Sequence, residues 1–454
     1  MATHPIHVRL RTPYVSTPKA LSPGSSIAVV GSGVAGLTAA HLLSHEHDVT
    51  VLEADARLGG HAHTQLLPTS DGRVLKVDTG FIVHNDRTYP TLLRLFAELG
   101  VPTQETDMSM SVSSMVTGLE YAGALGVRGL FPSPRNVVSV RHLRLLAQVR
   151  RFHRLARRVL DEPADDVPLS RFVATAGLSS YFVDNFLLPL VAAVWSCDAA
   201  TAADYPARYL FAFLDHHGML TVFGSPAWRT VTGGSDTYVQ AIARGVVASG
   251  GAVRTSSEVL DLRETADGVV VRSSAATEVY DAVVVATHPH QALAMLDRPT
   301  VAQRTVLGAI GYSPKHAVLH TDESLLPRAR RARASWNYQI RTDGDGVAVT
   351  YDLTRLMRLP DSGERALVTM GRTDLVDPRT IVAEMSYEHP VYDVESVAAQ
   401  RRLAEIDTAR MSFAGAYHGW GFHEDGAAAG AAAARRFGGR WGRTDDDLLA
   451  EAFS

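Results

Sequence analysis

Cysteine is nearly absent from this sequence, and its scarcity limits the chemistry that the protein can use. Cys197 is the single cysteine among 454 residues, which excludes intramolecular disulfides and metal clusters built on several thiolates. The histidines show no metal-ligand spacing either. We therefore predict no metal site, and we expect Cys197 to be a small core residue.

Long apolar runs and an excess of positive charge are also lacking. The longest apolar run, residues 186–195, is far shorter than the roughly 20 residues that span a bilayer. The first 24 residues lack the apolar centre of a secretion signal. A net charge of −4 gives no overall attraction to nucleic acid. We expect a cytoplasmic protein, soluble or peripheral to the inner face of the membrane, that binds no nucleic acid.

The sequence does contain enough apolar material for more than one core. Hydrophobic residues make up 46% of the chain and charged residues 20%, close to the composition of globular proteins. A chain of 454 residues is long for a single hydrophobic core. Two domains, consecutive or interleaved, are expected.

A glycine-rich loop marks the start of the first domain. The apolar strand 27–30 leads into Gly31-Ser32-Gly33-Val34-Ala35-Gly36, a helical stretch follows at 37–43, and a second strand, 49–52, ends on Glu53. In a dinucleotide-binding unit, the three glycines permit the tight turn, the approach of the pyrophosphate and the close packing of helix on strand. Glu53 would accept hydrogen bonds from the ribose hydroxyls. No second loop of this kind occurs, so a separate NAD(P)H domain is not expected.

The residues that follow resemble a known superfamily. Glu53-Ala54-Asp55-Ala56-Arg57-Leu58-Gly59-Gly60-His61 is similar to the E-x-x-x-R-x-G-G-R signature of flavin-containing amine oxidases, protoporphyrinogen oxidases and carotenoid desaturases, with His61 in place of the last arginine. Arg57 would place a fixed cation near the cofactor phosphates, and the paired glycines would let the backbone pass close to a flat ring. The resemblance implies FAD as the cofactor.

Further segments match the same superfamily in the same order. They are Val77-Asp78-Thr79-Gly80, Gly233-Gly234-Ser235, Ser257-Glu258-Val259, Val285-Ala286-Thr287, Gly415-Ala416-Tyr417 and residues 421–430, where Asp425 replaces the glutamate of many relatives. By this resemblance, the FAD-binding residues are Gly31, Gly33, Val34, Ala35, Gly36, Glu53, Arg57, Gly59, Gly60, His61, Thr79, Gly80, Val259, Thr287, Gly415, Ala416, Asp425, Gly426 and Ala427.

The resemblance also implies an α/β fold, with a discontinuous Rossmann-like FAD-binding domain and an inserted α+β substrate domain. Strand-like and helical runs along the chain support this division. We predict a flexible N-terminal arm (1–24), three segments of the FAD-binding domain (25–84, 228–300 and 405–440), a helical insertion (85–227) and a sheet part (301–404) of the substrate domain, and a C-terminal tail (441–454).

The catalytic candidates are polar residues in otherwise apolar segments, because flavin oxidation needs no nucleophilic side chain. Lys315, one of three lysines, opens the strand-like run 315–320; in relatives, a lysine in a similar strand holds water near the flavin. His216 and His217 suit a general base or proton relay, and His423 lies inside the C-terminal flavin motif. The alternatives are a surface lysine, paired histidines on a structural loop, and a histidine that only orients its loop.

Residues 128–160 contain nine arginines and no acidic residue. Their spacing predicts a helical insertion with an apolar stripe formed by Leu143, Leu146, Val149, Phe152, Leu155, Ala156 and Val159. The region from Arg128 to Arg158 is suited to contact with anionic phospholipid. The alternative is a solvated helix that covers a domain.

A narrower resemblance bears on the substrate. Residues 78–90, Asp107-Met108-Ser109, Trp336-Asn337-Tyr338 and residues 421–426 resemble a bacterial subfamily of NAD/FAD-binding proteins encoded near cyclopropane-fatty-acid-synthase-type methyltransferases. This implies a hydrophobic, fatty-acyl substrate that is oxidised or desaturated by hydride transfer to flavin N5, and a methyltransferase as partner. Two alternatives stay open: an amine oxidase, and a flavin-binding accessory protein of the methyltransferase without turnover of its own.

Overall fold

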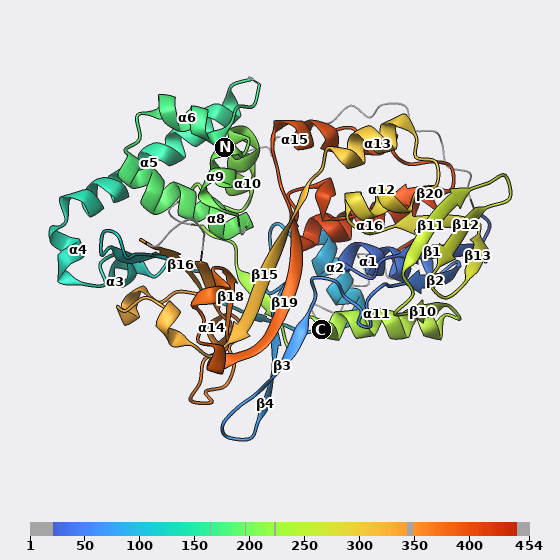
Figure 1. Cartoon of the computed structure of the whole chain (residues 1–454), viewed down its shortest axis with the longest axis horizontal. Helices are drawn as coiled ribbons and strands as arrows, with labels where there is room; N and C mark the ends of the chain where they lie inside the picture. Colours follow the sequence, from blue (N-terminus) through green and yellow to red (C-terminus); the bar gives the residue numbers. More distant parts are fainter. Residues whose placement is uncertain (1–20, 164, 196, 222–223, 343–347, 443–454) are drawn as a thin grey trace. The chain divides into compact units, whose positions relative to one another are not determined.

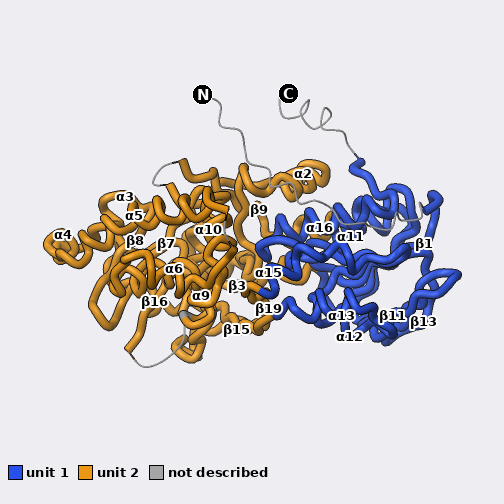
Figure 2. Tube along the Cα trace, turned by 90° about the horizontal axis from the view of Figure 1, so that it is seen from above, with its two compact units in different colours: residues 1–58, 242–311, 395–444 blue, residues 59–241, 312–394, 445–454 orange. Residues whose placement is uncertain are grey.

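The structure, a computed structural model, describes residues 21–163, 165–195, 197–221, 224–342 and 348–442. Most of the predicted arm and tail therefore lies outside the described residues. Contacts divide the chain into two compact units, which Figure 2 shows in separate colours. Unit 1 contains Met1–Leu58, Ile242–Gly311 and Glu395–Thr444, and unit 2 contains Gly59–Ala241, Tyr312–Val394 and Asp445–Ser454.

Unit 1 is built on a five-stranded parallel sheet (Figure 1), in the order β10-β2-β1-β14-β20. The central strands are buried along almost their whole length, which explains why their sequences are continuous apolar runs. The strands are β1 (Ser26–Val30), β2 (Asp48–Leu52), β10 (Ala252–Arg254), β14 (Ala282–Val285) and β20 (Met411–Phe413). The predicted strand-turn-helix-strand unit is therefore confirmed, and so is the α/β fold class.

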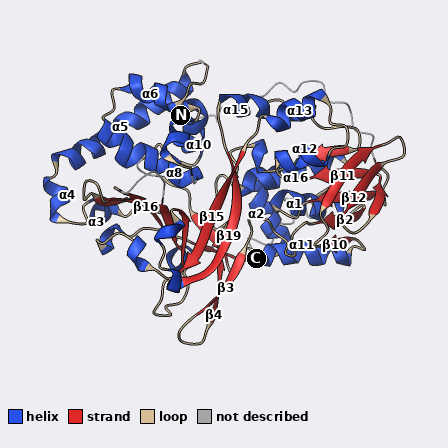
Figure 3. Ribbon diagram, viewed as in Figure 1, coloured by secondary structure: helices blue, strands red, loops and turns tan. Residues whose placement is uncertain are grey.

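Helices and a small antiparallel sheet complete unit 1 (Figure 3). Helix α1 (Val34–Leu43) packs along α16 (His423–Arg436), so that the two glycine-containing helices lie side by side. The small sheet contains β11 (Val259–Glu264), β12 (Val269–Ser273) and β13 (Thr277–Tyr280). The remaining helices are α11 (Asp236–Ala248), which begins in unit 2, α12 (Pro289–Met295), α13 (Val301–Gly308) and α15 (Val394–Gln400).

Unit 2 is built on a seven-stranded mixed sheet, in the order β19-β15-β18-β17-β16-β7-β8. Its longest pairing joins β15 to β19 in antiparallel register. The strands are β7 (Met110–Ser114), β8 (Glu120–Gly123), β15 (Tyr312–His320), β16 (Trp336–Ile340), β17 (Ala348–Asp352), β18 (Leu367–Gly371) and β19 (Ile381–Pro390). Two small sheets contain β3 (Thr64–Pro68) with β4 (Val74–Asp78), and β5 (His84–Asn85) with β6 (Thr103–Glu105) and β9 (Trp228–Val231).

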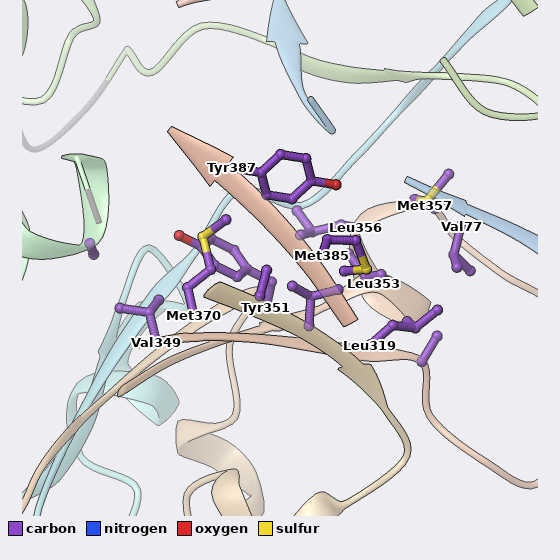
Figure 4. Packing of buried hydrophobic residues seen from close by; sticks show 14 of the residues in the cluster. Val77, Leu319, Val349, Tyr351, Leu353, Leu356, Met357, Met370, Met385 and Tyr387 are labelled. Atoms are coloured by element: carbon purple, nitrogen blue, oxygen red, sulfur yellow. The ribbon is translucent and has the colours of Figure 1, made fainter. Parts of the chain in front are cut away.

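One face of this sheet buries an apolar cluster (Figure 4). Leu319 of β15, Met385 of β19 and Val77 of β4 meet in it. Residues 59–84 group with unit 2 by their contacts, whereas the sequence prediction placed them in the FAD-binding domain, because Leu67 and Val77 pack into this cluster.

Most helices of unit 2 lie within residues 85–227, where the helical insertion was predicted. They are α2 (Pro90–Leu99), α3 (Gly126–Leu130), α4 (Pro134–Val138), α5 (Val140–Asp161), α6 (Leu169–Ala176), α7 (Ser180–Phe182), the π-helical turn η1 (Val183–Leu187), α8 (Leu188–Trp195), α9 (Ala199–Asp204) and α10 (Ala207–His216), whereas α14 (Leu353–Leu356) lies between β17 and β18. The apolar run 186–195 forms part of η1 and all of α8, and Cys197 is buried as predicted.

The prediction for residues 128–160 needs two corrections. The segment is three helices, not one, because prolines at 132 and 134 separate α3 from α4 and a further break precedes α5. The apolar stripe was also partly wrong: Leu143 is 45% exposed, whereas Leu145 and His142 are buried. Nε2 of the buried His142 lies 2.8 Å from the carbonyl oxygen of Leu130, which satisfies one of its ring nitrogens.

Candidate functional site

The glycine loop between β1 and α1 forms a cradle for phosphate. Gly31 has a φ of +96°, which favours glycine. A Cβ at Gly36 would overlap the carbonyl oxygen of Gly31 and lie 3.2 Å from Cβ of Ala286, so this glycine permits close packing of helix and strand. At Gly33, in contrast, a Cβ would meet nothing within 4 Å. The open space beside Gly33 is where the motif brings a pyrophosphate against the backbone.

The N-terminus of α1 is prepared for an anion. Gly33 is its N-cap and has no side chain to cap the helix, and the first turn contains no acidic residue. The backbone N–H groups of this turn, which include those of Val34 and Ala35, are therefore available to a negative ligand at the positive end of the helix dipole.

Helix α16 approaches α1 through its own glycines. A Cβ at Gly430 would overlap the carbonyl oxygen of Ala35, and one at Gly426 would lie 2.7 Å from Cγ1 of Val34. Glycine at both positions thus allows α16 to start close to the phosphate cradle. Ala427, in the first turns of α16, is buried.

Glu53 lies at the end of β2, where the ribose acceptor was predicted. Its Oε2 accepts the backbone N–H of Ser32 at 2.8 Å, and its Oε1 accepts that of Asp55 at 2.9 Å. The carbonyl oxygen of Glu53 accepts the N–H of Ser257, which brings the segment leading to Val259 beside it. Glu53 is thus fixed beside the glycine loop, as a ribose acceptor must be.

Other predicted residues of unit 1 follow the ends of parallel strands. Thr287 comes just after β14, and Gly415 and Ala416 come just after β20. Carboxyl ends of neighbouring parallel strands share one edge of a sheet, which is the usual edge for ligands. Arg57, near the end of the unit's first segment, donates to the carbonyl oxygen of Leu58 at 3.4 Å.

Asp425 has an unusual environment at the start of α16. Its Oδ2 accepts the backbone N–H of Phe422 at 2.9 Å, and burial raises the pKa of its carboxyl to about 7. His423, the first residue of the same helix, is buried. Its catalytic role stays a prediction.

The second part of the motif, in unit 2, is a tightly crossed pair of backbone segments. Gly59 and Gly60 both have positive φ. A Cβ at Gly80 would overlap the carbonyl oxygen of His61, which accepts the N–H of Phe81 at 2.7 Å. These glycines let two chain segments that resemble flavin-contacting segments run against each other.

Asp78 connects these crossed backbone segments to the loop at residues 233–235 through hydrogen bonds. The buried carboxylate accepts the backbone N–H of Ser235 at 2.9 Å and the hydroxyls of Ser235 and Thr64. Burial raises its pKa to about 6, although these hydrogen bonds act in the opposite direction. The resemblance had linked both segments to the flavin, and the structure shows that Asp78 connects them.

Lys315 lies in a group of polar side chains that the sequence did not reveal. In the β15–β19 pairing, Lys315 is opposite Tyr387 and Ser313 is opposite His389, so all four project from one face of the two strands. Nζ of Lys315 donates to Oγ of Ser313 at 2.9 Å.

Tyr387 connects this group to the predicted flavin-contacting residues. Its hydroxyl lies 2.8 Å from Oγ1 of Thr79 and 3.0 Å from Nδ1 of His63. The ring of His61 lies against Tyr387 and His389, with ring centroids 5.2 and 5.6 Å apart. We call this set the polar face; it contains His61, His63, Thr79, Ser313, Lys315, Tyr387 and His389.

Sequence reasoning missed His63, Tyr387 and His389. The signal that could have found Tyr387 and His389 is the alternation in 381–390, where Met385, Tyr387 and His389 share one side and the glutamates at 384 and 388 share the other. His63 gave no such signal, since its partner lies 324 residues away.

The histidine pair is not on a loop, which corrects the prediction. His216 is the last residue of α10 and is exposed, whereas His217 caps the helix and is buried. His217 stacks on Phe213 with ring centroids 4.1 Å apart, and its Nδ1 lies 3.0 Å from the carbonyl oxygen of Phe213. Burial lowers its pKa to about 4. The catalytic role of the pair stays a prediction.

Within the described residues, no helix is both long and apolar enough to cross a bilayer.

A parallel sheet with a glycine cradle, an acidic strand end and two apposed helices is the arrangement of a dinucleotide-binding domain. Its residues fit the diphosphate and ribose of such a cofactor, because they supply N–H donors and a carboxylate acceptor in an open space. The sequence pattern of the family described as "Flavin containing amine oxidoreductase" matches residues 34–331. The chain belongs to this family of FAD-dependent oxidoreductases.

Individual relatives are similar over shorter stretches. Amine oxidase [flavin-containing] A of Canis lupus familiaris is 36% identical over 114 residues, which cover 25% of this chain and 20% of the canine enzyme. Amine oxidase [flavin-containing] B of Mus musculus is 35% identical over 123 residues, 26% of this chain and 21% of the murine enzyme. The matched segment thus spans about a fifth of the length of these curated relatives.

Solved structures share the fold over nearly the whole chain. Cyclohexylamine oxidase from Brevibacterium oxydans has a TM-score of 0.64 at 16% identity, covering 95% of this chain and 100% of that one. A fatty acid isomerase from P. acnes that produces CLA has a TM-score of 0.65 at 17% identity, covering 92% and 100%. At this identity, the likeness shows the fold alone.

Proposed function

We propose that this protein binds FAD and oxidises or desaturates a hydrophobic substrate, specifically a fatty-acyl chain. The observation that carries the cofactor assignment is the cradle of unit 1, in which a Cβ at Gly33 would meet open space while Glu53 is fixed beside it. FAD would place its diphosphate against the N–H groups of Val34 and Ala35 and its ribose at Glu53.

When bound, a flavin accepts a hydride from a substrate C–H bond. The task of the protein is then to orient the substrate, exclude water and manage the proton. Thr79 and Tyr387 are both buried, and their hydroxyls are 2.8 Å apart. In this proposal, the Tyr387 hydroxyl holds a proton between Thr79 and His63 and positions the substrate.

The composition of the polar face supports a substrate that is not a cation. Its ionisable members are Lys315, three histidines and a tyrosine. None of these is a carboxylate, the group that would pair with the ammonium group of an amine substrate. The family resemblance to proteins encoded beside fatty-acyl-modifying methyltransferases points the same way.

The face continues into apolar side chains along the same strands. Ala317 and Leu319 follow Lys315 on one side of β15, and Met385 and Ala383 follow Tyr387 on the same side of β19 (Figure 4). Ala317, Leu319 and Met385 are buried in the apolar cluster, so they support the two strands that carry the polar face. A fatty acid isomerase with this fold is one precedent for an acyl substrate, beside an amine oxidase with the same fold.

The test is reduction of the bound flavin without oxygen. We expect purified protein to lose its yellow colour when mixed with unsaturated or cyclopropane-containing phospholipids, and to keep it with simple primary amines. Bleaching by amines alone would replace this proposal with the amine oxidase alternative. The third outcome is that neither lipids nor amines bleach the flavin, while the lipids of the host change only when a methyltransferase is present. This outcome would favour the alternative of a flavin-binding accessory protein without turnover of its own.

A matched pair of variants connects the test to the polar face. Tyr387→Phe keeps the aromatic packing but removes the hydroxyl between Thr79 and His63. We expect the rate of flavin reduction to fall about 10- to 100-fold, in the range of a lost proton-handling group, with its pH profile altered. Tyr351→Phe, in the same apolar cluster, is the control and should leave the rate unchanged. Equal rates in all three proteins would remove Tyr387 from the proposal.

A further inference from the structure

One end of unit 2 exposes an unusual number of apolar side chains. They lie on α3, on α4 and at the start of α5, which are neighbours in both Figure 1 and Figure 2. The residues are Val127, Val137, Val138, Val140 and Leu143, with exposed fractions from 45% to 79%. Apolar residues that gather on one surface mark an interaction site more often than a solvated one.

Exposed arginines share these helices. Arg128 lies on α3, Arg135 on α4, and Arg141 and Arg144 on the first turns of α5, and all four are exposed. No acidic residue occurs on these helices before Asp161. Within the described part of the chain, the side chains of Arg128, Arg135 and Arg144 form no ion pair.

A second basic segment, distant in sequence, packs against the first. The 3-10 turn η3 (Arg330–Ala332) contacts α3 and β8. The carboxylate of Glu120 in β8 accepts the backbone N–H groups of Arg328 and Ala329 at 2.9 and 2.8 Å, which fixes this segment in place. Arg328, Arg330 and Arg331 are exposed there. We call α3, α4, residues 140–144 and residues 328–331 the basic corner.

The rest of α5 differs from the basic corner. Arg151 donates to the carbonyl oxygen of Ala176, and Arg157 donates to that of Leu220. The large apolar side chain of this part, Phe152, is fully buried. The sequence prediction spread membrane contact over Arg128 to Arg158, whereas the exposed valines of this region lie between residues 127 and 140.

We propose that the basic corner docks on the surface of an anionic phospholipid bilayer. The exposed valines enter the interface between head groups and acyl chains, and arginines from the two segments face the lipid phosphates. Charge complementarity selects this occupant: seven exposed arginines with exposed apolar residues between them fit a surface that is negative outside and apolar beneath. The proposal does not depend on the substrate, because a flavoprotein that oxidises a soluble compound could dock equally well.

The experiment is sedimentation of the full-length protein with vesicles. Vesicles of phosphatidylcholine alone are compared with vesicles that also contain phosphatidylglycerol, at low and at high salt. We expect binding only to the anionic vesicles and a strong loss at high salt. Binding to both kinds alike, or to neither, would overturn the proposal.

Two sets of substitutions locate the contact. Arg128→Ser, Arg135→Ser and Arg144→Ser together should weaken binding at least tenfold, since each arginine near an anionic surface contributes about fivefold. Val137→Ser with Val138→Ser should also weaken it, because inserted apolar area is lost. The matched controls change exposed residues of unit 1. One control combines Arg263→Ser, Arg272→Ser and Arg298→Ser, and the other combines Val279→Ser and Val301→Ser. Both should bind vesicles as the unaltered protein does.

A fluorescent reporter separates insertion from other contacts. Val138, 79% exposed on α4, is replaced by Trp, and its emission should shift to the blue when anionic vesicles are added. No shift, despite sedimentation, would contradict insertion of the valines. A different result would be that the arginine variant binds vesicles as before but no longer binds an acidic protein. That result would assign the basic corner to a protein partner and overturn the proposal.

Discussion

Gly33 offers the sharpest test of the cofactor cradle, because its neighbourhood separates binding from folding. It is the N-cap of α1 with φ −64° and ψ 176°, a conformation open to any residue, and a Cβ would meet nothing within 4 Å. In Gly33→Ala, a less favourable N-cap and a less flexible unfolded chain act in opposite directions. We therefore expect the free energy of unfolding of the cofactor-free protein to change by under about 1 kcal/mol.

The effect on FAD should be much larger. The added methyl group would fill the space through which the diphosphate approaches the backbone. Losing one hydrogen bond to a charged group costs about 1.5–3 kcal/mol, so the Kd for FAD should rise about 10- to 100-fold. Thermal unfolding of cofactor-free protein and titration with FAD measure the two quantities separately.

Gly36→Ala is the matched control. Its Cβ would overlap the carbonyl oxygen of Gly31 and lie 3.2 Å from Cβ of Ala286, so overpacking should destabilise the cofactor-free protein by about 1–3 kcal/mol. If Gly33→Ala bound FAD as tightly as the unaltered protein, the assignment of the cradle would be refuted. A cofactor-free Gly33→Ala protein as unstable as Gly36→Ala would refute the structural account of the loop.

Three further predictions concern buried groups. The folded-state pKa of Asp78 is raised to about 6. The stability that its carboxyl contributes is therefore full below about pH 3.8 and is lost as the pH rises through 6. Between pH 4 and 7, the free energy of unfolding of Asp78→Asn should rise by up to about 3 kcal/mol relative to that of the unaltered protein, measured as unfolding midpoints across that range. Burial lowers the pKa of His84 to about 4, and neither ring nitrogen has a hydrogen-bond partner among the described residues; its contribution is present above about pH 6.5 and lost as the pH falls toward 4. His84→Phe should therefore be more stable and lose less stability on acidification, and an unchanged acid transition would count against this. Phe152 is fully buried among the rings of Phe172, Phe182 and Phe211, so Phe152→Ala should lower the free energy of unfolding by about 3–5 kcal/mol in denaturant titrations, whereas a loss under 1 kcal/mol would show that the helices repack.

Local sequence determined the first strand-turn-helix-strand unit of the protein. The strands, the glycine loop, the first helix and Glu53 lie within about 30 consecutive residues, and each element there forms for local reasons: apolar runs for buried strands, glycine where φ is positive, and an acid at a strand end. Hydrogen bonds of Glu53 to Ser32 and Asp55 stay within the same stretch. For this reason the strands, the turn and the helix of this stretch could be predicted from the sequence.

Only the tertiary structure decided the polar face and the basic corner. Lys315 was selected for its rarity, but its position opposite Tyr387 depends on the register of β15 with β19, and Tyr387 reaches Thr79 across 308 residues of sequence. In the same way, Arg328 joins the arginines of α3 through a bond to Glu120 that is 208 residues away. Such contacts depend on how strands pair and how helices pack, which no local preference of the residues encodes. The sequence by itself therefore determined where the glycine loop and its flanking strands lie, and the tertiary structure decided which distant side chains stand together.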